Sequence, residues 1–289
     1  MPTICFGQQP CGFFPKRFLI AKIHKARELQ KKLGGKIVFF YHDSDADYRE
    51  TITIMTDRQS GAEVRLNFTQ ENKIQKNFSP LYKKRVPEGW KEEILKQLPR
   101  FIAVNRPHPS TSSGQALASP IKGEKSAVSP PLAGGAGGGG LAEIFKSVDQ
   151  KFVADFCLEM YKKMGLLEGV EILRSSDQDF RLKAPDLATD YFADVEYQGE
   201  IVRGQLIDGK LQLHEGGGKY TEIPMPANIE KWQKSPGRDQ RFGWMQSVIH
   251  CTHYVTGEAE SDYLKKNSFP DVEFIVREKI DQSDYAWLE

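Results

Sequence analysis

The amino-terminal part of the chain alternates short apolar runs with one amphipathic segment. Apolar residues recur every three or four positions over residues 18–33, which predicts a helix, and Gly34-Gly35 supply the turn that ends it. Residues 3–7 and 36–41 form apolar runs rich in β-branched and aromatic side chains, as is typical of strands buried on both faces. Strand, helix and strand with short connections predict a right-handed βαβ unit, so the expected fold class is α/β.

The carboxyl-terminal half predicts further elements of the same sheet. Apolar residues form one stripe over residues 141–164, which predicts a single long helix packed against the sheet. The pattern also predicts a strand at 170–174, a helix at 238–250, a strand at 252–255, a helix at 258–265 and a strand at 272–276. We therefore expect the first strand and the strand at 252–255 to belong to one sheet.

Two other segments predict antiparallel structure. Residues 51–56 and 62–68 are separated by a polar turn, which predicts a hairpin added to the main sheet. Residues 193–223 alternate in polarity and turn repeatedly, so they predict an antiparallel β subregion. Together these elements predict a Rossmann-like parallel sheet core that carries an antiparallel subregion.

Residues 105–140 differ in composition from the rest of the chain. They consist largely of Pro, Ser, Ala and Gly and contain almost no large apolar side chains. Such a segment cannot bury enough surface to offset the entropy of ordering it, so it predicts a disordered internal insertion. Because both flanks are predicted helices, we expect residues 1–104 and 141–289 to form one discontinuous domain.

Composition and charge narrow the class of protein. Forty Lys and Arg residues stand against 39 Asp and Glu residues in a chain of 289, and this balance disfavours a nucleic-acid partner. The four cysteines show no CxxC spacing, and the start of the chain does not resemble a signal peptide. No apolar stretch approaches about 18 residues, the length a membrane helix needs. These features predict a cytoplasmic protein with reduced thiols, no membrane segment and a small-molecule substrate.

The strand at 36–41 ends abruptly in an acidic loop, residues 42–47. In open α/β sheets, ligands bind beyond the carboxyl ends of the strands, where this loop is expected to lie. A calcium loop is excluded, because Tyr48 and Ile54 stand where that motif needs Gly and Glu. A magnesium ion shared with a ligand phosphate remains possible, since Mg²⁺ needs only one or two protein carboxylates. The alternative is a solvated acidic loop.

Three stretches resemble the bacillithiol-biosynthesis cysteine-adding enzyme family. The first two are Gly7-Gln8-Gln9-Pro10 with Gly12-Phe13-Phe14, and the acidic loop 42–47; the third comprises Ser235-Pro236 with residues 238–246 and 254–264. The resemblance is partial, because the long coiled-coil portion of that family has no counterpart here. It implies a Rossmann-like, nucleotidyltransferase-type core and an enzyme similar to those that join a cysteine carboxylate to a glucosamine amine.

From these residues we expect an enzyme that binds a nucleotide or another anionic metabolite. The expected catalytic residues are His42, Asp43 and Asp45. His42 could move a proton, while Asp43, Asp45 and Asp47 would hold a cation or orient an amine. Asp43 and Asp45 are also the expected ligands of Mg²⁺, so a nucleotide and Mg²⁺ are the expected cofactors. The reaction is either a carboxylate–amine condensation or a nucleotidyl transfer.

Other predicted ligand-binding residues lie at the first strand and near the carboxyl end. Gln8 and Gln9 would present amides at the tip of the first strand, and Lys16 or Arg17 would face a phosphate or carboxylate. Three more residues are predicted to line the same crevice: His253, Glu258 and Glu260. Zinc binding by His250, Cys251 and His253 is disfavoured, because no further ligand motif accompanies them.

Two other functions stay open from the sequence. A noncatalytic nucleotide- or metabolite-binding protein would explain the missing coiled-coil portion. An RNA-binding protein would use basic and aromatic residues between positions 73 and 90. Its expected contacts are Lys73, Lys76, Lys83, Lys84 and Arg85, with Phe78, Tyr82 and Trp90 as stacking groups.

Overall fold

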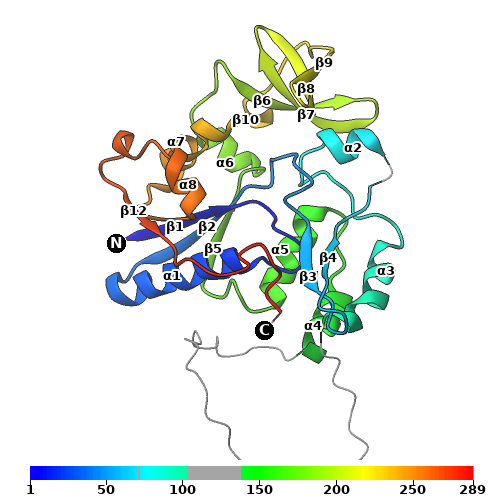
Figure 1. Cartoon of the computed structure of the whole chain (residues 1–289). Helices are drawn as coiled ribbons and strands as arrows, with labels where there is room; N and C mark the ends of the chain where they lie inside the picture. The colour runs from blue at the N-terminus through cyan, green and yellow to red at the C-terminus, as the bar shows by residue number, and fades with distance from the viewer. Residues whose placement is uncertain (71, 103–137, 289) are drawn as a thin grey trace, which may run out of the picture.

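A five-stranded parallel sheet forms the centre of the protein (Figure 1). The computed structural model describes residues 1–70, 72–102 and 138–288. The strands run in the order β12 (Glu273–Val276), β11 (His253–Thr256), β1 (Thr3–Gln8), β2 (Lys36–Tyr41) and β5 (Val170–Arg174). Ile4 pairs with His253 on one side and with Ile37 on the other. The two ends of the chain therefore share one sheet, which confirms the sequence-based prediction.

Helices cover both faces of this sheet because its strands are apolar on both sides. Along β2, Ile37 and Phe39 face α1 (Arg17–Leu33) and α5 (Val153–Lys163). The alternate residues Val38 and Phe40 face α6 (Gln178–Lys183) and α7 (Arg238–Ile249). This period-two division into two apolar clusters is the reason that the strand is an uninterrupted apolar run in sequence. The predicted α/β fold class is confirmed.

A second, antiparallel sheet adjoins the carboxyl edge of the parallel sheet. Figure 1 shows it at the top of the molecule. Its order is β10 (Lys234–Pro236), β6 (Tyr191–Tyr197), β7 (Glu200–Ile207), β8 (Lys210–Gly216) and β9 (Lys219–Ile223). This sheet confirms the predicted antiparallel subregion. The predicted hairpin also forms, as β3 (Thr53–Thr56) and β4 (Glu63–Leu66), but the two strands make a separate sheet and do not extend the main one.

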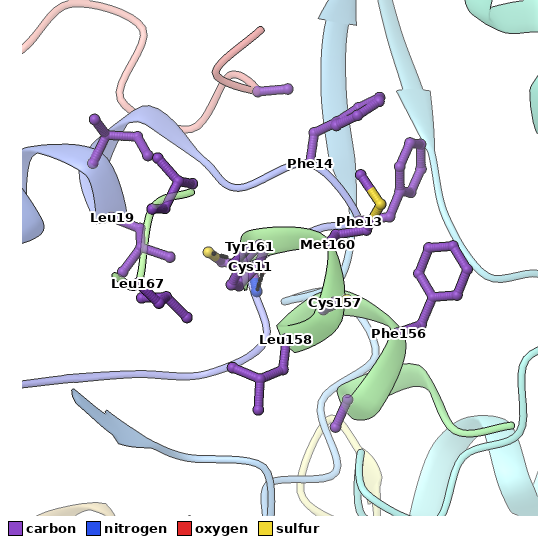
Figure 2. Close-up of a cluster of buried hydrophobic side chains, with 14 of the residues drawn as sticks. Cys11, Phe13, Phe14, Leu19, Phe156, Cys157, Leu158, Met160, Tyr161 and Leu167 are labelled. Carbon is purple, nitrogen blue, oxygen red and sulfur yellow. Dashed lines mark hydrogen bonds between the residues drawn. The ribbon is translucent and has the colours of Figure 1, made fainter. Parts of the chain in front are cut away.

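The turn after β1 enters the hydrophobic core. Cys11, Phe13 and Phe14 have no exposed surface and pack beside α5, as Figure 2 shows. The hydroxyl of Tyr161 on α5 accepts a hydrogen bond from the Cys11 amide (3.0 Å) and donates one to the Gly12 carbonyl (2.7 Å). Gly12 has φ +96°, and a Cβ there would lie 2.7 Å from the Phe14 carbonyl oxygen. The turn is thus a packing feature that fixes where the tip of β1 lies.

The long helix predicted over residues 141–164 is wrong as a single element. The structure has α4 (Gly138–Ser147) and α5, separated by residues 148–152. The backbone between them bonds elsewhere: the Val86 amide donates to the Lys151 carbonyl, and the Val153 amide donates to the Lys84 carbonyl, both at 2.8 Å. Hydrogen bonds to residues 84–86 replace a helical turn, although the apolar stripe continues across the break.

Several short helices complete the described residues. They are α2 (Lys73–Phe78), α3 (Trp90–Gln97), α8 (Glu258–Tyr263) and the 3₁₀ turns Leu98–Arg100, Lys231–Gln233 and Lys266–Ser268. In the parts of the chain that the structure describes, no helix is long and apolar enough to cross a bilayer. The predicted disordered insertion, residues 105–140, falls outside the described residues except for its last three positions, which belong to α4.

Candidate functional site

The order of the strands identifies one place in the sheet where a ligand crevice is expected. From β1 the chain passes to β2 on one side, and it later adds β11 and β12 on the other side. Ligands of open α/β sheets bind beyond the carboxyl ends of the strands at such a reversal. The candidate site is therefore the region around the tips of β1, β2 and β11.

Two arginines share one carboxylate at this edge. Arg241 on α7 donates to Asp45 at 3.0 Å, and Arg203 on β7 has a nitrogen 3.9 Å from the same carboxylate. The Gln9 amide also donates to Asp45, at 3.4 Å. Burial would raise the pKa of Asp45, but the two guanidinium charges outweigh burial and hold that pKa well below its usual range. Because Asp45 is ionised, two positive charges face one negative charge.

Arg203 is buried, and two neighbouring groups hold its guanidinium in place. Its guanidinium lies 3.7 Å from the centre of the Phe192 ring and donates to the Pro236 carbonyl at 3.2 Å. Burial, with repulsion from Arg241, lowers the pKa of Arg203 to about 10 in spite of the attraction of Asp45. An anion-binding site needs positive charge that protein carboxylates do not fully balance before the ligand binds, and Arg203 provides such a charge.

The amino end of α7 adds positive potential at the same edge. The helix ends three residues before β11 starts, at the amino edge of the sheet, so its beginning lies about 18 Å away, toward the carboxyl edge. Its N-cap residue is Gly237, which has no capping side chain, and the first turn carries one acidic residue, Asp239. Free amides and the helix dipole favour an anion at this position.

Gly7 allows a histidine and a tyrosine to approach the tip of β1. A Cβ at position 7 would lie 2.8 Å from Nε2 of His42 and 2.7 Å from the hydroxyl of Tyr254. The His42 ring packs edge-on against Phe40, and its buried Nδ1 has no hydrogen-bond partner in the described structure. Burial, followed by the charges of Arg241 and Lys22, keeps the pKa of His42 well below 6.5. The imidazole is therefore neutral at pH 7.

A partly buried ion pair lies next to Gly7 and Tyr254. Lys22 on α1 donates to Glu260 at 2.7 Å and to the Gly7 carbonyl at 2.8 Å. Glu260 also accepts a hydrogen bond from Tyr254 at 2.8 Å, and Lys22 reaches the Gln8 side chain at 3.4 Å. The structure thus brings together five of the predicted residues: Gln8, Gln9, His42, Asp45 and Glu260.

Asp43 lies apart from this group and is occupied by other partners. Its carboxylate is fully buried and accepts hydrogen bonds from Arg174 (2.6 Å), the Ser176 hydroxyl (2.7 Å), the Ser176 amide (3.0 Å) and the Ser175 hydroxyl (3.1 Å). These contacts tie the end of β2 to the end of β5. Asp43 and Asp45 therefore have different partners, and over the described ranges no three His, Cys, Asp or Glu side chains are placed to hold a metal ion.

Lys16 and Arg17 contact the carboxyl-terminal segment of the chain. Lys16 pairs with Asp284 at 4.0 Å, and the Arg17 side chain donates to Gln282 at 3.3 Å. The first amides of α1 donate to carbonyls of the same segment, Arg17 to Tyr285 (2.9 Å) and Phe18 to Ser283 (3.0 Å). The chain itself therefore occupies the position where these residues were predicted to meet a phosphate.

Three other predicted residues lie outside the group. The structure does not place His253 at the crevice. It begins β11, about 10 Å from the tip of that strand, and its ring is 3.4 Å from Glu273. Asp47 pairs with the exposed Arg49 at 2.6 Å, and Arg49 outweighs burial in lowering the pKa of Asp47. Glu258 is exposed at the start of α8.

Three of the eight residues expected to bind RNA are buried in the structure. Phe78 and Trp90 are buried, so their rings cannot stack on bases. Lys84 is 2% exposed and donates to the carbonyls of Ala46 (2.5 Å) and Lys76 (2.8 Å). Burial lowers the pKa of Lys84 to about 7. The hydrogen bond from Lys84 to Ala46 stabilises the loop that carries Asp45.

Sequence reasoning missed the positive charges of the site. Lys22 lies inside the helix 18–33, and Arg203 lies inside an alternating strand, where a single charge has no distinguishing pattern. Arg241 falls within a stretch that carries the family resemblance, and that stretch was the one available signal.

No family model matches the chain, and no curated protein is significantly similar to it in sequence.

Proposed function

We propose that the protein is an enzyme whose carboxyl-edge crevice binds an anionic metabolite. The observation that carries this proposal is the sharing of one carboxylate, Asp45, by the guanidiniums of Arg203, which is buried, and Arg241, which is partly buried. The uncapped start of α7 adds to the same positive potential. The anionic part of a ligand would complete the charge balance of this cluster, and the Gln9 amide would add a hydrogen bond.

His42 is the proposed proton acceptor of the reaction. It is neutral because its pKa is lowered by burial, and it lies beside Gly7 at the strand tip. An amine or hydroxyl nucleophile that attacks an acyl or phosphoryl centre must lose a proton, which Nε2 of His42 would accept. The two guanidiniums would hold the anionic reacting group or its leaving group. This chemistry is shared by carboxylate–amine ligation, which the family resemblance implies, and by nucleotidyl transfer.

Four free, buried thiols support a reducing location, so we propose that the enzyme is cytoplasmic.

A nucleotide and Mg²⁺ are its proposed cofactors. The protein would supply few ligands to Mg²⁺, because Asp43 and Asp45 are each paired with an arginine. Most of the ligands of the ion would then come from nucleotide phosphates and water.

The test uses tripolyphosphate and citrate as anionic probes, with EDTA present to remove metal ions. R241Q should weaken the binding of both probes by roughly 10- to 100-fold, because a hydrogen bond to a charged group contributes about 1.5–3 kcal/mol. The matched control is R65Q, which removes an exposed arginine from β4 far from the crevice. Equal affinities of wild type, R241Q and R65Q would refute the anion site.

A noncatalytic binding protein is the competing outcome. It would retain the effect of R241Q on probe binding, yet it would show no turnover when amine and activated carboxylate substrates are supplied together. H42N separates the two cases, since it should abolish turnover in an enzyme while leaving the probe affinity within about twofold of the wild-type value.

A further inference from the structure

A small hollow lies between α7 and the segment that follows α8. Its volume is about 150 Å³, and it is lined by aromatic rings and a few polar groups. Phe242 and Phe269 meet edge to face at 4.8 Å, while the guanidinium of Arg238 lies 5.1 Å from the centre of the Tyr263 ring. A pocket for a whole metabolite usually has roughly 300–1,000 Å³, so this hollow has room for one flat ring system.

A glycine in the middle of α7 keeps the hollow open. Gly243 is the sixth residue of this helix, and glycine disfavours a helix relative to alanine. A Cβ at this position would lie 3.2 Å from the Phe269 ring, so any side chain would extend into the space. Gly243 also lines a second hollow, of about 300 Å³, next to Trp244. The missing side chain leaves room next to Phe269.

The hollow adjoins the proposed anion site along α7. Arg241, which holds Asp45, comes directly before Phe242 and one helical turn after Arg238. On α8, Tyr263 lines the hollow, while Glu260, three residues earlier, pairs with Lys22 in the crevice. Residues three apart on a helix share a face, so each helix links the hollow to the crevice over about 5 Å. One ligand can reach both places.

We propose that this hollow binds the base of a nucleoside phosphate whose phosphates are held by Arg203 and Arg241. The assignment rests on the proposed function, which it extends to a substrate class. The exposed Tyr263 ring would stack on the base, and Arg238 would add a cation–π contact. Gln240 and Ser268 provide polar groups for the edge of the ring.

The test compares ATP with tripolyphosphate, which has a similar charge and no base, by calorimetry in EDTA. Wild type should bind ATP at least about fivefold more tightly than tripolyphosphate, because stacking of a base on an aromatic side chain contributes that much. Y263A should remove this difference and leave the affinity for tripolyphosphate unchanged. The matched control is Y220A, an equally exposed tyrosine on β9. G243L, which fills the hollow, should act like Y263A.

The outcomes separate the two proposals. Equal affinity of wild type for ATP and tripolyphosphate, or no ATP binding at all, overturns the base subsite. A loss of ATP affinity in Y220A as large as that in Y263A overturns it too. If Y263A weakens ATP binding while R241Q affects neither probe, the subsite stands and the proposed anion site fails. If R241Q weakens both probes and Y263A affects neither, the anion site stands and the subsite fails.

Discussion

Replacing Asp43 by Asn should destabilise the protein without weakening the binding of an anionic probe. The carboxylate is fully buried and pairs with Arg174 at 2.6 Å. Removal of one partner of a buried ion pair costs roughly 3–5 kcal/mol. Arg174 keeps Asp155 as a second partner, also at 2.6 Å, and Asn keeps one acceptor oxygen, so we expect the lower end, about 3 kcal/mol. For a chain of this size that is a fall in Tm of roughly 6–12 °C.

Thermal and urea unfolding of wild type, D43N and D155N test this reasoning. D155N is the matched control, because Asp155 binds the same arginine but is 29% exposed, and its loss should cost about 1 kcal/mol or less. Tripolyphosphate affinity should be equal in all three proteins. An unchanged Tm in D43N together with lost probe binding would contradict the structural role and restore the catalytic role predicted for Asp43 from the sequence.

Three further predictions concern buried groups near the site. G7A should lower stability and any turnover together, since its Cβ would overlap His42 and Tyr254; refolding and activity assays measure both effects. Stability should fall as the pH drops below about 6.5, because the unfolded chain takes up a proton that buried His42 does not, and H42N should reduce this slope in urea titrations. Stability should rise between about pH 7 and 10.5, where only the unfolded state keeps Lys84 protonated, and K84M should reduce that rise.

The parallel core could be predicted because its signals are local. The apolar run at 36–41 and the amphipathic helix before it each carry the full pattern of their element, and β2 has the predicted bounds. The break between α4 and α5 could not be predicted, because the hydrogen bonds that replace the helical turn come from residues 84–86. Backbone pairing between distant segments leaves no mark on the periodicity of either segment.

The placement of several polar residues could be predicted for the same reason. Gln9, His42 and Asp45 lie at the strand tips as expected, since the end of a buried strand can be located from sequence alone. Asp43 and Asp45 are equivalent in a sequence pattern, but β2 ends at Tyr41, so strand periodicity does not fix where these two side chains point. One of them meets Arg174, and the other meets Arg241. The two carboxylates could not be told apart from sequence, because these partners lie more than a hundred residues away.

The affinity of the D45N variant for tripolyphosphate in EDTA tests the central claim most directly. Asn keeps the acceptor for the Ala46 amide but frees the guanidiniums of Arg203 and Arg241 from their carboxylate. If these arginines form an anion site for which Asp45 competes, D45N should bind the probe roughly tenfold more tightly than wild type, while its unliganded form is less stable. Unchanged binding by D45N would contradict the account, because Asp45 would then not compete with the probe. Weaker binding would contradict it too, because Asp45 would then itself contribute to holding the ligand.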